Sequence, residues 1–200
     1  MIAVIDYGMG NLRSVQKALE ASGGITQITS DKAVITKARK IVLPGVGAVR
    51  PAMERLKELG LIDTIRSQVA SGKPFLGICL GFQVLFDSST EGGKTESLGI
   101  LPGVVERFPD TVKVPQMGWN SVRIVQQGCP MYKGIDDGAF FYFCHSFYAR
   151  PENKTITATT TSYGIDYTSS VCHNNIWGVQ FHPEKSQALG LGILRNFILC

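Results

Sequence analysis

The sequence predicts an α/β fold: an open, mixed but largely parallel central sheet flanked by helices, with an antiparallel β extension in the second half. Two observations lead to this prediction. In the first half, short runs rich in Val, Ile and Phe alternate with segments of helical periodicity, a pattern typical of a parallel sheet covered on both faces. After about Gly99, strand-like runs follow one another and leave too little room for crossover helices.

The first half alternates strands and helices in a regular order. The apolar runs that we expect to be strands are residues 2–6, 25–29, 40–45 and 74–78. The segments with helical spacing of apolar residues are 11–23, 48–60, 61–72 and 81–89.

The second half contains strand-like runs with turn residues between them. These runs are residues 104–108, 120–125, 139–147, 155–161 and 171–181. The last segment, 186–200, has apolar residues at helical spacing, and we expect it to pack back onto the sheet.

Composition narrows the class of protein. With 200 residues, of which 44% are hydrophobic and 18% charged, residues 1–200 suit a single domain with one substantial core. The net charge of +4 includes no run of basic residues, so we expect no nucleic-acid partner. No apolar stretch approaches the length of a membrane span and no leader is evident, which predicts a soluble cytoplasmic protein. The five scattered cysteines contain no CxxC pair, so we expect neither disulfides nor a bound metal.

Cys79 is the candidate nucleophile. In PFLGICLGFQVLF it lies between Gly77 and Gly81, where a buried strand gives way to an amphipathic helix. Such turns need small flanking residues because the nucleophile adopts a strained backbone conformation. The helix N-terminus would favour the thiolate, and the N–H of Leu80 would point to where an oxyanion forms. The alternative is an inert buried thiol, which we expect of the other four cysteines.

His182 and Glu184 are the candidate base and its orienting carboxylate. In WGVQFHPEKS, Pro183 favours an extended conformation at His182, so His182 and Glu184 project from the same side of the chain. The carboxylate can then accept a hydrogen bond from one ring nitrogen and leave the other for the thiol.

The other two histidines fit this role less well. His145 follows Cys144 in a strand, where neighbours face opposite sides, so these two residues cannot form a dyad. We expect His145 to line the core or a pocket, and His173 to be a solvated turn residue.

A second oxyanion donor is expected from the loop after the third strand. This strand ends in Pro44-Gly45-Val46-Gly47, at the carboxyl edge where open α/β sheets bind ligands. Proline has no N–H, so the donor must come from Gly45, Val46 or Gly47. Glycines on both sides of Val46 would let its peptide unit rotate, which could make the donor a switch. The alternative is a turn without a donor role.

A second glycine cluster, Asp6-Tyr7-Gly8-Met9-Gly10-Asn11, resembles a dinucleotide-binding fingerprint because it follows a strand and opens a helix. Arg13 replaces the third glycine of that fingerprint, and no acidic residue follows at the expected strand end. We therefore do not expect nucleotide binding or any other cofactor.

The motifs GICLGFQ and VQFHPE together resemble those of class I glutamine amidotransferases, which use a Cys-His-Glu triad. The stretches IDYGMGNLRSV, LPGVGAV, PQMGWN and YFCHSFY narrow the resemblance. They are similar to the glutaminase subunits of imidazole glycerol phosphate synthases, and the similarity extends over essentially the whole chain. One departure is Phe147, where that family has tyrosine, which removes a hydroxyl.

The resemblance implies a heterodimer with a (β/α)8-barrel cyclase, which would join the released ammonia to a phosphoribulosyl aminoimidazole carboxamide in histidine biosynthesis. The residues that it implies for holding glutamine or lining its pocket are Gln83, Glu91, His145 and Ser146. The residues that it implies at or near the cyclase interface are Asn11, Trp119, Tyr142 and Lys185.

Trp119 suggests an interface without reference to the family. It lies between Gly118 and Asn120 in the segment PQMGWN, which reads as a turn, and a loop tryptophan suits an interface anchor. The alternative is that its ring folds over the edge of its own core.

These residues predict a glutaminase that hydrolyses glutamine through a Cys79 thioester and has low activity without its partner. Three alternatives remain open from the sequence. They are the glutaminase of another pathway, such as anthranilate, aminodeoxychorismate or pyridoxal phosphate synthesis; an inactive subunit that only regulates a partner; and a cysteine peptidase or γ-glutamyl hydrolase.

Overall fold

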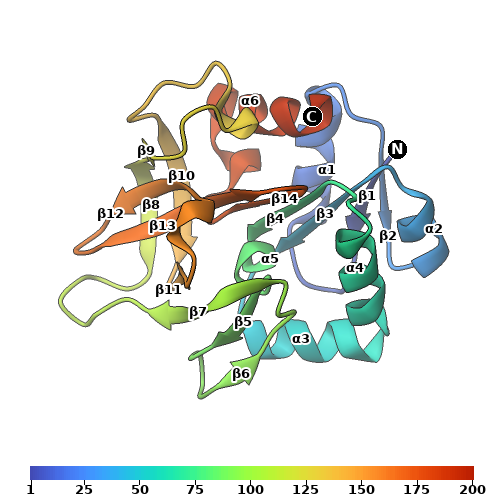
Figure 1. The fold of residues 1–200 in the computed structure, drawn as a ribbon, viewed down its shortest axis with the longest axis horizontal. Coiled ribbons are helices and arrows are strands. Elements are labelled where there is room, and N and C mark those ends of the chain that lie inside the picture. The colour runs from blue at the N-terminus through green and yellow to red at the C-terminus, as the bar shows by residue number, and fades with distance from the viewer.

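The first half of the chain forms the parallel part of a central sheet. In the computed structural model, which describes residues 1–200, neighbouring parallel strands run in the order β2, β1, β3, β4 and β14 (Figure 1). All but β14 come from the first half of the sequence, as the alternation of strands and helices predicts. Their bounds are β1 (Ile2–Ile5), β2 (Thr26–Thr29), β3 (Lys40–Gly45), β4 (Phe75–Cys79) and β14 (Ile176–Val179).

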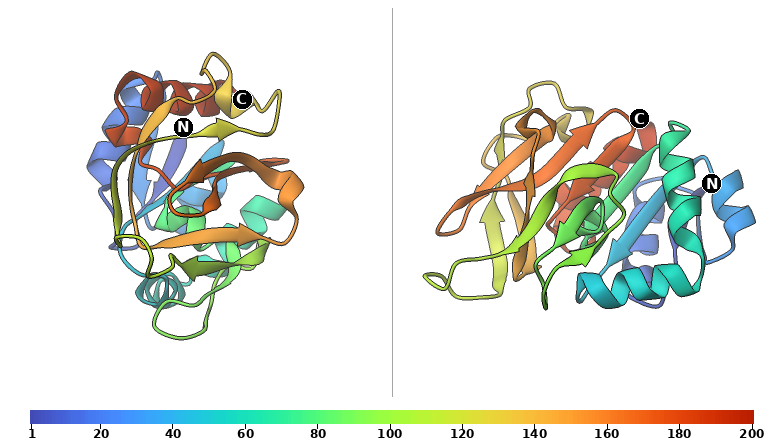
Figure 2. Two further views of the ribbon diagram at one scale, coloured as in Figure 1. Left: turned by 90° about the vertical axis from the view of Figure 1, so that its left-hand side faces the viewer. Right: turned by 60° about the horizontal axis from the view of Figure 1, so that its bottom comes forward.

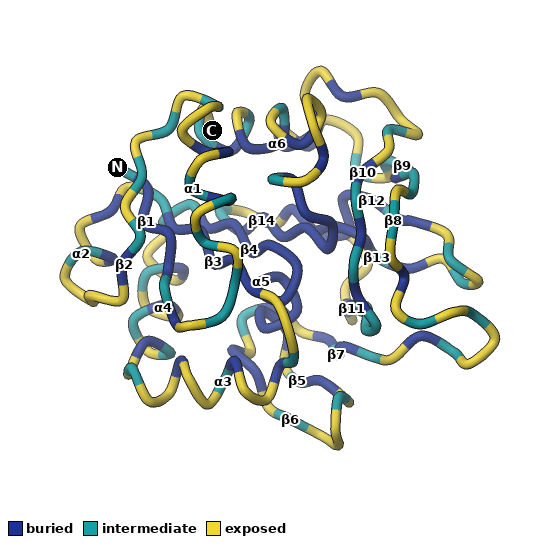
Figure 3. Tube along the Cα trace, turned by 180° about the vertical axis from the view of Figure 1, so that it is seen from behind, coloured by how far each residue is buried: buried dark blue, intermediate teal, exposed yellow.

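Helices cover both faces of this parallel part. Along β1, Val4 belongs to a cluster with Val15 of α1 and Phe197 of α6, whereas Ile5 packs with Leu56 of α3 on the opposite face. Strands β1, β4 and β14, which lie between the two helical layers, are buried along their whole length (Figure 3). No helix has the length and apolar character that a membrane span requires. The bounds are α1 (Leu12–Ala21), α2 (Lys32–Lys37), α3 (Val49–Glu58), α4 (Leu61–Ala70) and α6 (Gln187–Leu199).

The second half extends the sheet, mostly with antiparallel strands. From β14 the order continues through β13, β11, β7, β5 and β6; β12 pairs with β13, and β9 pairs with β12 (Figure 2). Only β5 and β7 pair in parallel here. The mixed, largely parallel sheet with an antiparallel extension is thus confirmed. The bounds are β5 (Phe86–Ser89), β6 (Thr95–Glu96), β7 (Leu101–Arg107), β9 (Arg123–Ile124), β11 (Phe147–Pro151), β12 (Thr157–Ser162) and β13 (Asp166–His173).

β8 (Gln116–Ser121) and β10 (Phe140–His145) form a separate antiparallel pair. Side chains alternate between its two faces. Phe141 and Phe143 are buried on one face. The other face carries Met117 and Trp119 of β8 beside Phe140 and Tyr142 of β10, and we call these four residues the aromatic face.

The helix predicted over residues 81–89 is confirmed only for its first turn and is wrong for the rest. Helix α5 (Leu80–Gln83) is a single turn, and strand β5 begins at Phe86. Every residue from 80 to 86 is buried, so the segment has no polar side of the kind an amphipathic helix needs. It enters the sheet beside β7 instead.

Two further local predictions need correction. PQMGWN contains most of strand β8 and is not a turn, so Trp119 is a strand residue that points to the exposed side. Helix α2 was not predicted, because it is only six residues long; the side chain of Asp31 caps it by accepting a hydrogen bond of 2.7 Å from the N–H of Ala33.

Two strand pairings bring the site residues together. β14 pairs in parallel with β4, so that Val179 lies opposite Ile78 and the residues after both strands emerge side by side. β3 lies on the other side of β4, with Gly45 opposite Cys79. The candidate residues near 45, 79 and 182 therefore meet at one edge of the sheet, at the carboxyl ends of its parallel strands.

Candidate active site

Cys79 occupies the strained turn that its flanking glycines predict. Its φ of 54° and ψ of −108° lie in a region that non-glycine residues rarely adopt. A Cβ atom on Gly77 would lie 2.5 Å from the carbonyl oxygen of Gly81, and one on Gly81 would collide with the carbonyl of Leu43. Only glycines allow the backbone to turn this tightly between β4 and α5.

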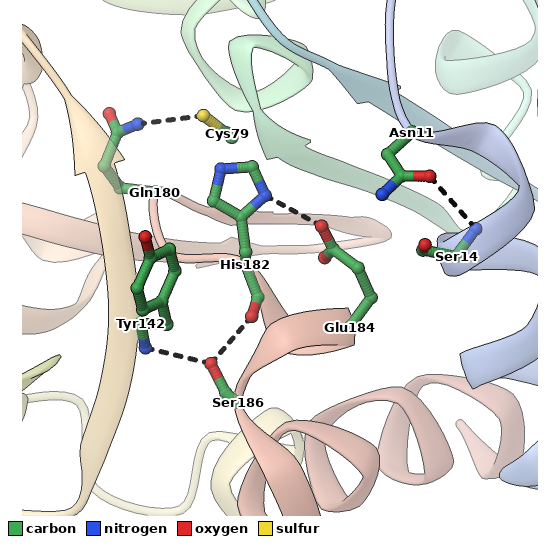
Figure 4. A network of polar contacts seen from close by, with 8 residues as sticks. All are labelled: Asn11, Ser14, Cys79, Tyr142, Gln180, His182, Glu184 and Ser186. Atoms are coloured by element: carbon green, nitrogen blue, oxygen red, sulfur yellow. Dashed lines mark hydrogen bonds and ion pairs between the residues drawn. The ribbon is translucent and has the colours of Figure 1, made fainter. Parts of the chain in front are cut away.

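His182 lies between Cys79 and Glu184. Its Nδ1 is 2.8 Å from Oε1 of Glu184, and its other ring nitrogen faces the sulfur of Cys79 (Figure 4). The imidazole and the carboxylate are almost fully buried. His182 is extended, as predicted before a proline, but the chain then forms a 3-10 turn at Pro183–Lys185, which brings the carboxylate back to the ring.

The environment of His182 favours its protonated form. Burial alone would lower its pKa, but hydrogen bonding to Cys79 and Glu184 outweighs burial and raises the pKa to about 10. A proton is therefore held next to the sulfur of Cys79, where an amine departing beside that sulfur would need it.

Gln180 also contacts Cys79, and the sequence prediction missed it. Its Nε2 donates to the sulfur of Cys79 over 3.8 Å (Figure 4), and its Oε1 accepts a hydrogen bond of 3.0 Å from Gln83. Gln83 also donates to the carbonyl of Phe147 at 2.9 Å. The sequence spacing could have predicted this contact, because two residues that are two positions apart in an extended chain, such as Gln180 and His182, project from the same side.

A cavity of about 290 Å³ opens onto the candidate nucleophile, Cys79. Within it, Oε2 of Glu91 accepts a hydrogen bond of 3.0 Å from the N–H of Val49, at the start of α3. The cavity includes all four residues predicted to hold glutamine or line its pocket. The lining residues are Val46, Gly47, Cys79, Gln83, Glu91, Pro115, Cys144, His145, Ser146, Phe147, His182 and Lys185.

His145 lines the cavity but is not arranged as a second base. One ring nitrogen is 2.7 Å from the carbonyl of Phe147, and the other is 3.3 Å from the hydroxyl of Tyr167. Burial lowers its pKa to about 4, although the bond to Phe147 opposes the shift and the nearby charge of His182 adds to it. His145 is therefore neutral near pH 7 and fixes the corner between β10 and β11. His173, by contrast, is exposed at the end of β13.

The predicted oxyanion donors lie on two elements beside Cys79. Leu80 is the first residue of α5, so its N–H has no partner within that helix. Gly45 ends β3 opposite Cys79, and Val46 and Gly47 follow it as exposed loop residues. Gly47 has a φ of 97°, a conformation that its lack of a side chain permits.

The predicted interface residues form two groups. The Trp119 side chain, 47% exposed, has its ring centre 6.2 Å from that of Tyr142, and Nζ of Lys185 lies 5.7 Å from the Tyr142 ring. Asn11 lies apart from these residues and caps α1 by accepting a hydrogen bond of 3.4 Å from the N–H of Ser14 (Figure 4).

No cluster of three or more His, Cys, Asp or Glu side chains is arranged to hold a metal ion. The five cysteines are all free thiols. The chemistry that the arrangement of Cys79, His182 and Glu184 can perform is attack by a buried thiol, with an adjacent imidazole as proton donor and acceptor.

Fold and site together define the class of the protein. A family model described as glutamine amidotransferase class-I matches residues 3–200, and the chain belongs to that family. Solved structures agree in fold. A glutamine amidotransferase superposes with a TM-score of 0.76 at 18% identity, covering 96% of this chain and 95% of that one. PurLQS from Thermotoga maritima superposes with a TM-score of 0.78 at 20% identity, covering 99% and 96%.

More similar relatives narrow the assignment. The imidazole glycerol phosphate synthase subunit HisH of Syntrophotalea carbinolica is 49% identical over 204 residues, covering 98% of each chain. The subunit of the same name from Moorella thermoacetica is 50% identical over 196 residues, covering 98% of this chain and 93% of the relative. Within the class I amidotransferases, the chain belongs to the HisH family.

Proposed function

We propose that this chain is the glutaminase subunit of an imidazole glycerol phosphate synthase, and that Cys79, His182 and Glu184 are its catalytic triad. One observation supports the triad above all: the buried His182 ring lies between the Cys79 sulfur and the Glu184 carboxylate. Residue types alone could occur by chance, but this order of nucleophile, base and orienting acid is the arrangement that acyl transfer requires.

In the first half-reaction, the Cys79 thiolate attacks the side-chain amide carbon of glutamine. The carbonyl oxygen becomes an oxyanion, which the N–H of Leu80 and an N–H from the Gly45–Gly47 loop stabilise. Protonated His182 gives its proton to the amide nitrogen, the C–N bond breaks, and ammonia leaves. A γ-glutamyl thioester on Cys79 remains.

In the second half-reaction, water replaces the thiol. Neutral His182 accepts a proton from water as its oxygen attacks the thioester carbon, and the C–S bond then breaks to release glutamate and the thiolate. Glu184 keeps the ring in one orientation through both steps. Gln83, Glu91, His145 and Ser146 bind the glutamine or line its pocket.

The ammonia passes to a cyclase subunit with a (β/α)8 barrel, in the cytoplasm and in the course of histidine biosynthesis. The aromatic face supports this proposal, because exposed aromatic and methionine side chains are enriched at protein interfaces. The face lies next to the cavity, since Tyr142 is followed on β10 by the cavity residues Cys144 and His145. We assign Asn11, Trp119, Tyr142 and Lys185 to this interface.

The experiment that tests the function is a glutaminase assay of the pure chain, alone and with the cyclase subunit. We expect low turnover alone, a large increase with the cyclase, and no turnover by Cys79→Ala in either case. A glutamine-analogue electrophile should label the wild-type protein at Cys79 only. Equal turnover with and without the cyclase would refute the coupling, and hydrolysis of glutamine by Cys79→Ala would refute the triad.

A further inference from the structure

The hydroxyl of Tyr7 is buried near the nucleophile without a hydrogen-bond partner. Tyr7 follows β1 by two residues, it is 1% exposed, and its hydroxyl oxygen has no hydrogen-bond partner. Burial, with a contribution from Cys79, raises the pKa of Tyr7 far above its usual value, so the hydroxyl keeps its proton. Buried polar groups in native proteins are almost always satisfied, which makes this one a candidate for a functional role.

The hydroxyl lies against the loop that we propose as the second oxyanion donor. A Cβ atom on Gly45 would collide with it, and one on Gly10 would lie 3.5 Å from Cα of Gly45. A Cβ on Gly47 would lie 3.1 Å from the end of the Met9 side chain. Residues 7–10 therefore pack along the Gly45–Gly47 loop. This contact gives a structural role to the N-terminal glycine cluster, for which we do not expect nucleotide binding.

Rotation of the Gly45–Gly47 loop would change which main-chain group lies next to the hydroxyl of Tyr7. When a peptide unit rotates, its N–H and C=O exchange directions. If an N–H of the Gly45–Gly47 loop turns toward the oxyanion, the carbonyl of that unit turns away from Cys79. A carbonyl displaced next to Gly45 needs a donor, and the unpaired hydroxyl of Tyr7 is within reach of Gly45.

We propose that Tyr7 is a positioning residue, whose hydroxyl donates a hydrogen bond to a main-chain carbonyl of the Gly45–Gly47 loop when that loop presents an N–H to the oxyanion. The inference rests on the proposed function, because it concerns the same oxyanion. On this proposal the hydroxyl of Tyr7 is unpaired when the loop is at rest and hydrogen-bonded when the loop has rotated.

Tyr7→Phe in the complex with the cyclase tests this proposal. We expect the melting temperature of the chain to stay the same or rise, because the hydroxyl makes no hydrogen bond at rest. The partner-stimulated kcat should fall about tenfold, with KM for glutamine within about twofold. The matched control is Tyr163→Phe, which removes a hydroxyl that bonds to the carbonyl of Lys113, and it should leave kcat unchanged.

A second measurement separates the loop from the thiol. Alkylation of Cys79 by iodoacetamide forms no oxyanion, so Tyr7→Phe should alkylate at the wild-type rate. A kcat equal to wild type, a lowered melting temperature, or slowed alkylation would each overturn the role in the loop. If wild type itself is not stimulated by the cyclase, the proposed function fails, and this inference fails with it.

Discussion

The two histidines in the cavity show how surroundings decide the role of a residue type. His182 contacts a sulfur and a carboxylate, which together hold a proton on it. His145 contacts a carbonyl and a phenol in a buried position, and remains neutral. One ring can therefore transfer protons, while the other braces the corner from which Ser146 and Phe147 line the cavity.

At this scale the pKa of His145 gives a prediction about stability. In the unfolded chain the ring protonates near pH 6.5, whereas in the folded chain it protonates only near pH 4. As pH falls between these values the unfolded state binds more protons, so stability is lost, by about 3 kcal/mol from pH 7 to pH 4.

Urea unfolding at several pH values checks this expectation. His145→Gln should lower stability at pH 7 but lack this part of the acid-induced loss. His173→Gln is the control, because His173 is exposed, and it should lose stability with wild-type slope. An equal slope in wild type and His145→Gln would show that the imidazole does protonate in the folded state.

At the scale of elements, Ser186 joins strand β10 to the catalytic loop. Its hydroxyl accepts a hydrogen bond of 3.0 Å from the N–H of Tyr142 and donates one of 2.7 Å to the carbonyl of His182 (Figure 4). The N–H of His182 in turn donates to the carbonyl of Tyr142 at 2.9 Å. The strand that carries half of the aromatic face therefore also fixes the backbone of the proposed base.

Ser186→Ala should for this reason lower kcat more than it raises KM, in addition to a loss of about 1–2 kcal/mol in stability. Steady-state glutaminase kinetics with the cyclase, together with urea unfolding, measure both effects. The control is Ser170→Ala, a buried serine on β13 that bonds to Tyr132 and Thr159. It should lose similar stability but keep kcat; an equal fall of kcat in both variants would contradict a specific role for Ser186.

Elements were predictable where the pattern was local. The first strands and the helices α1, α3 and α4 follow from apolar periodicity, and the turn at Cys79 follows from its flanking glycines. The helix after Cys79 was predicted too long because a run of buried residues fits a strand as well as a helix. The segment from Phe86 to Ser89 forms a strand because it pairs with β7, and this pairing is not local in sequence.

The candidate site was predictable through its motifs, which place Cys79 and the pair His182 and Glu184 on two short segments. The sequence did not show that these two segments lie side by side, because their proximity depends on the parallel pairing of β14 with β4. The contact of Gln180 with the sulfur depends on the same pairing. The unpaired hydroxyl of Tyr7 depends on how two loops pack, and no local pattern reports that.

At the scale of the whole molecule, two hydrophobic clusters lie on opposite faces of one shared sheet. This arrangement supports our proposal that residues 1–200 form a single domain. The aromatic face lies outside both clusters, so its side chains remain available to a partner.

Trp119→Ala should therefore weaken binding of the cyclase by about thirtyfold, because buried interface tryptophans commonly contribute 2 kcal/mol or more. Isothermal titration calorimetry against the cyclase measures the change. Ile25→Ala is the control, since Ile25 is 76% exposed and lies in the loop before β2. Unchanged affinity of Trp119→Ala would place the partner on another surface.

The position of β14 has a consequence for how the enzyme is made. This strand is synthesised after every other strand of the sheet, yet it lies in the interior of the sheet, between β4 and β13. The sulfur of Cys79 leaves the ribosome about 100 residues before Gln180. Until β14 inserts, a nascent chain carries the Cys79 thiol with no imidazole beside it. If the proposed triad is the catalytic machinery, such a chain releases no ammonia before it has folded.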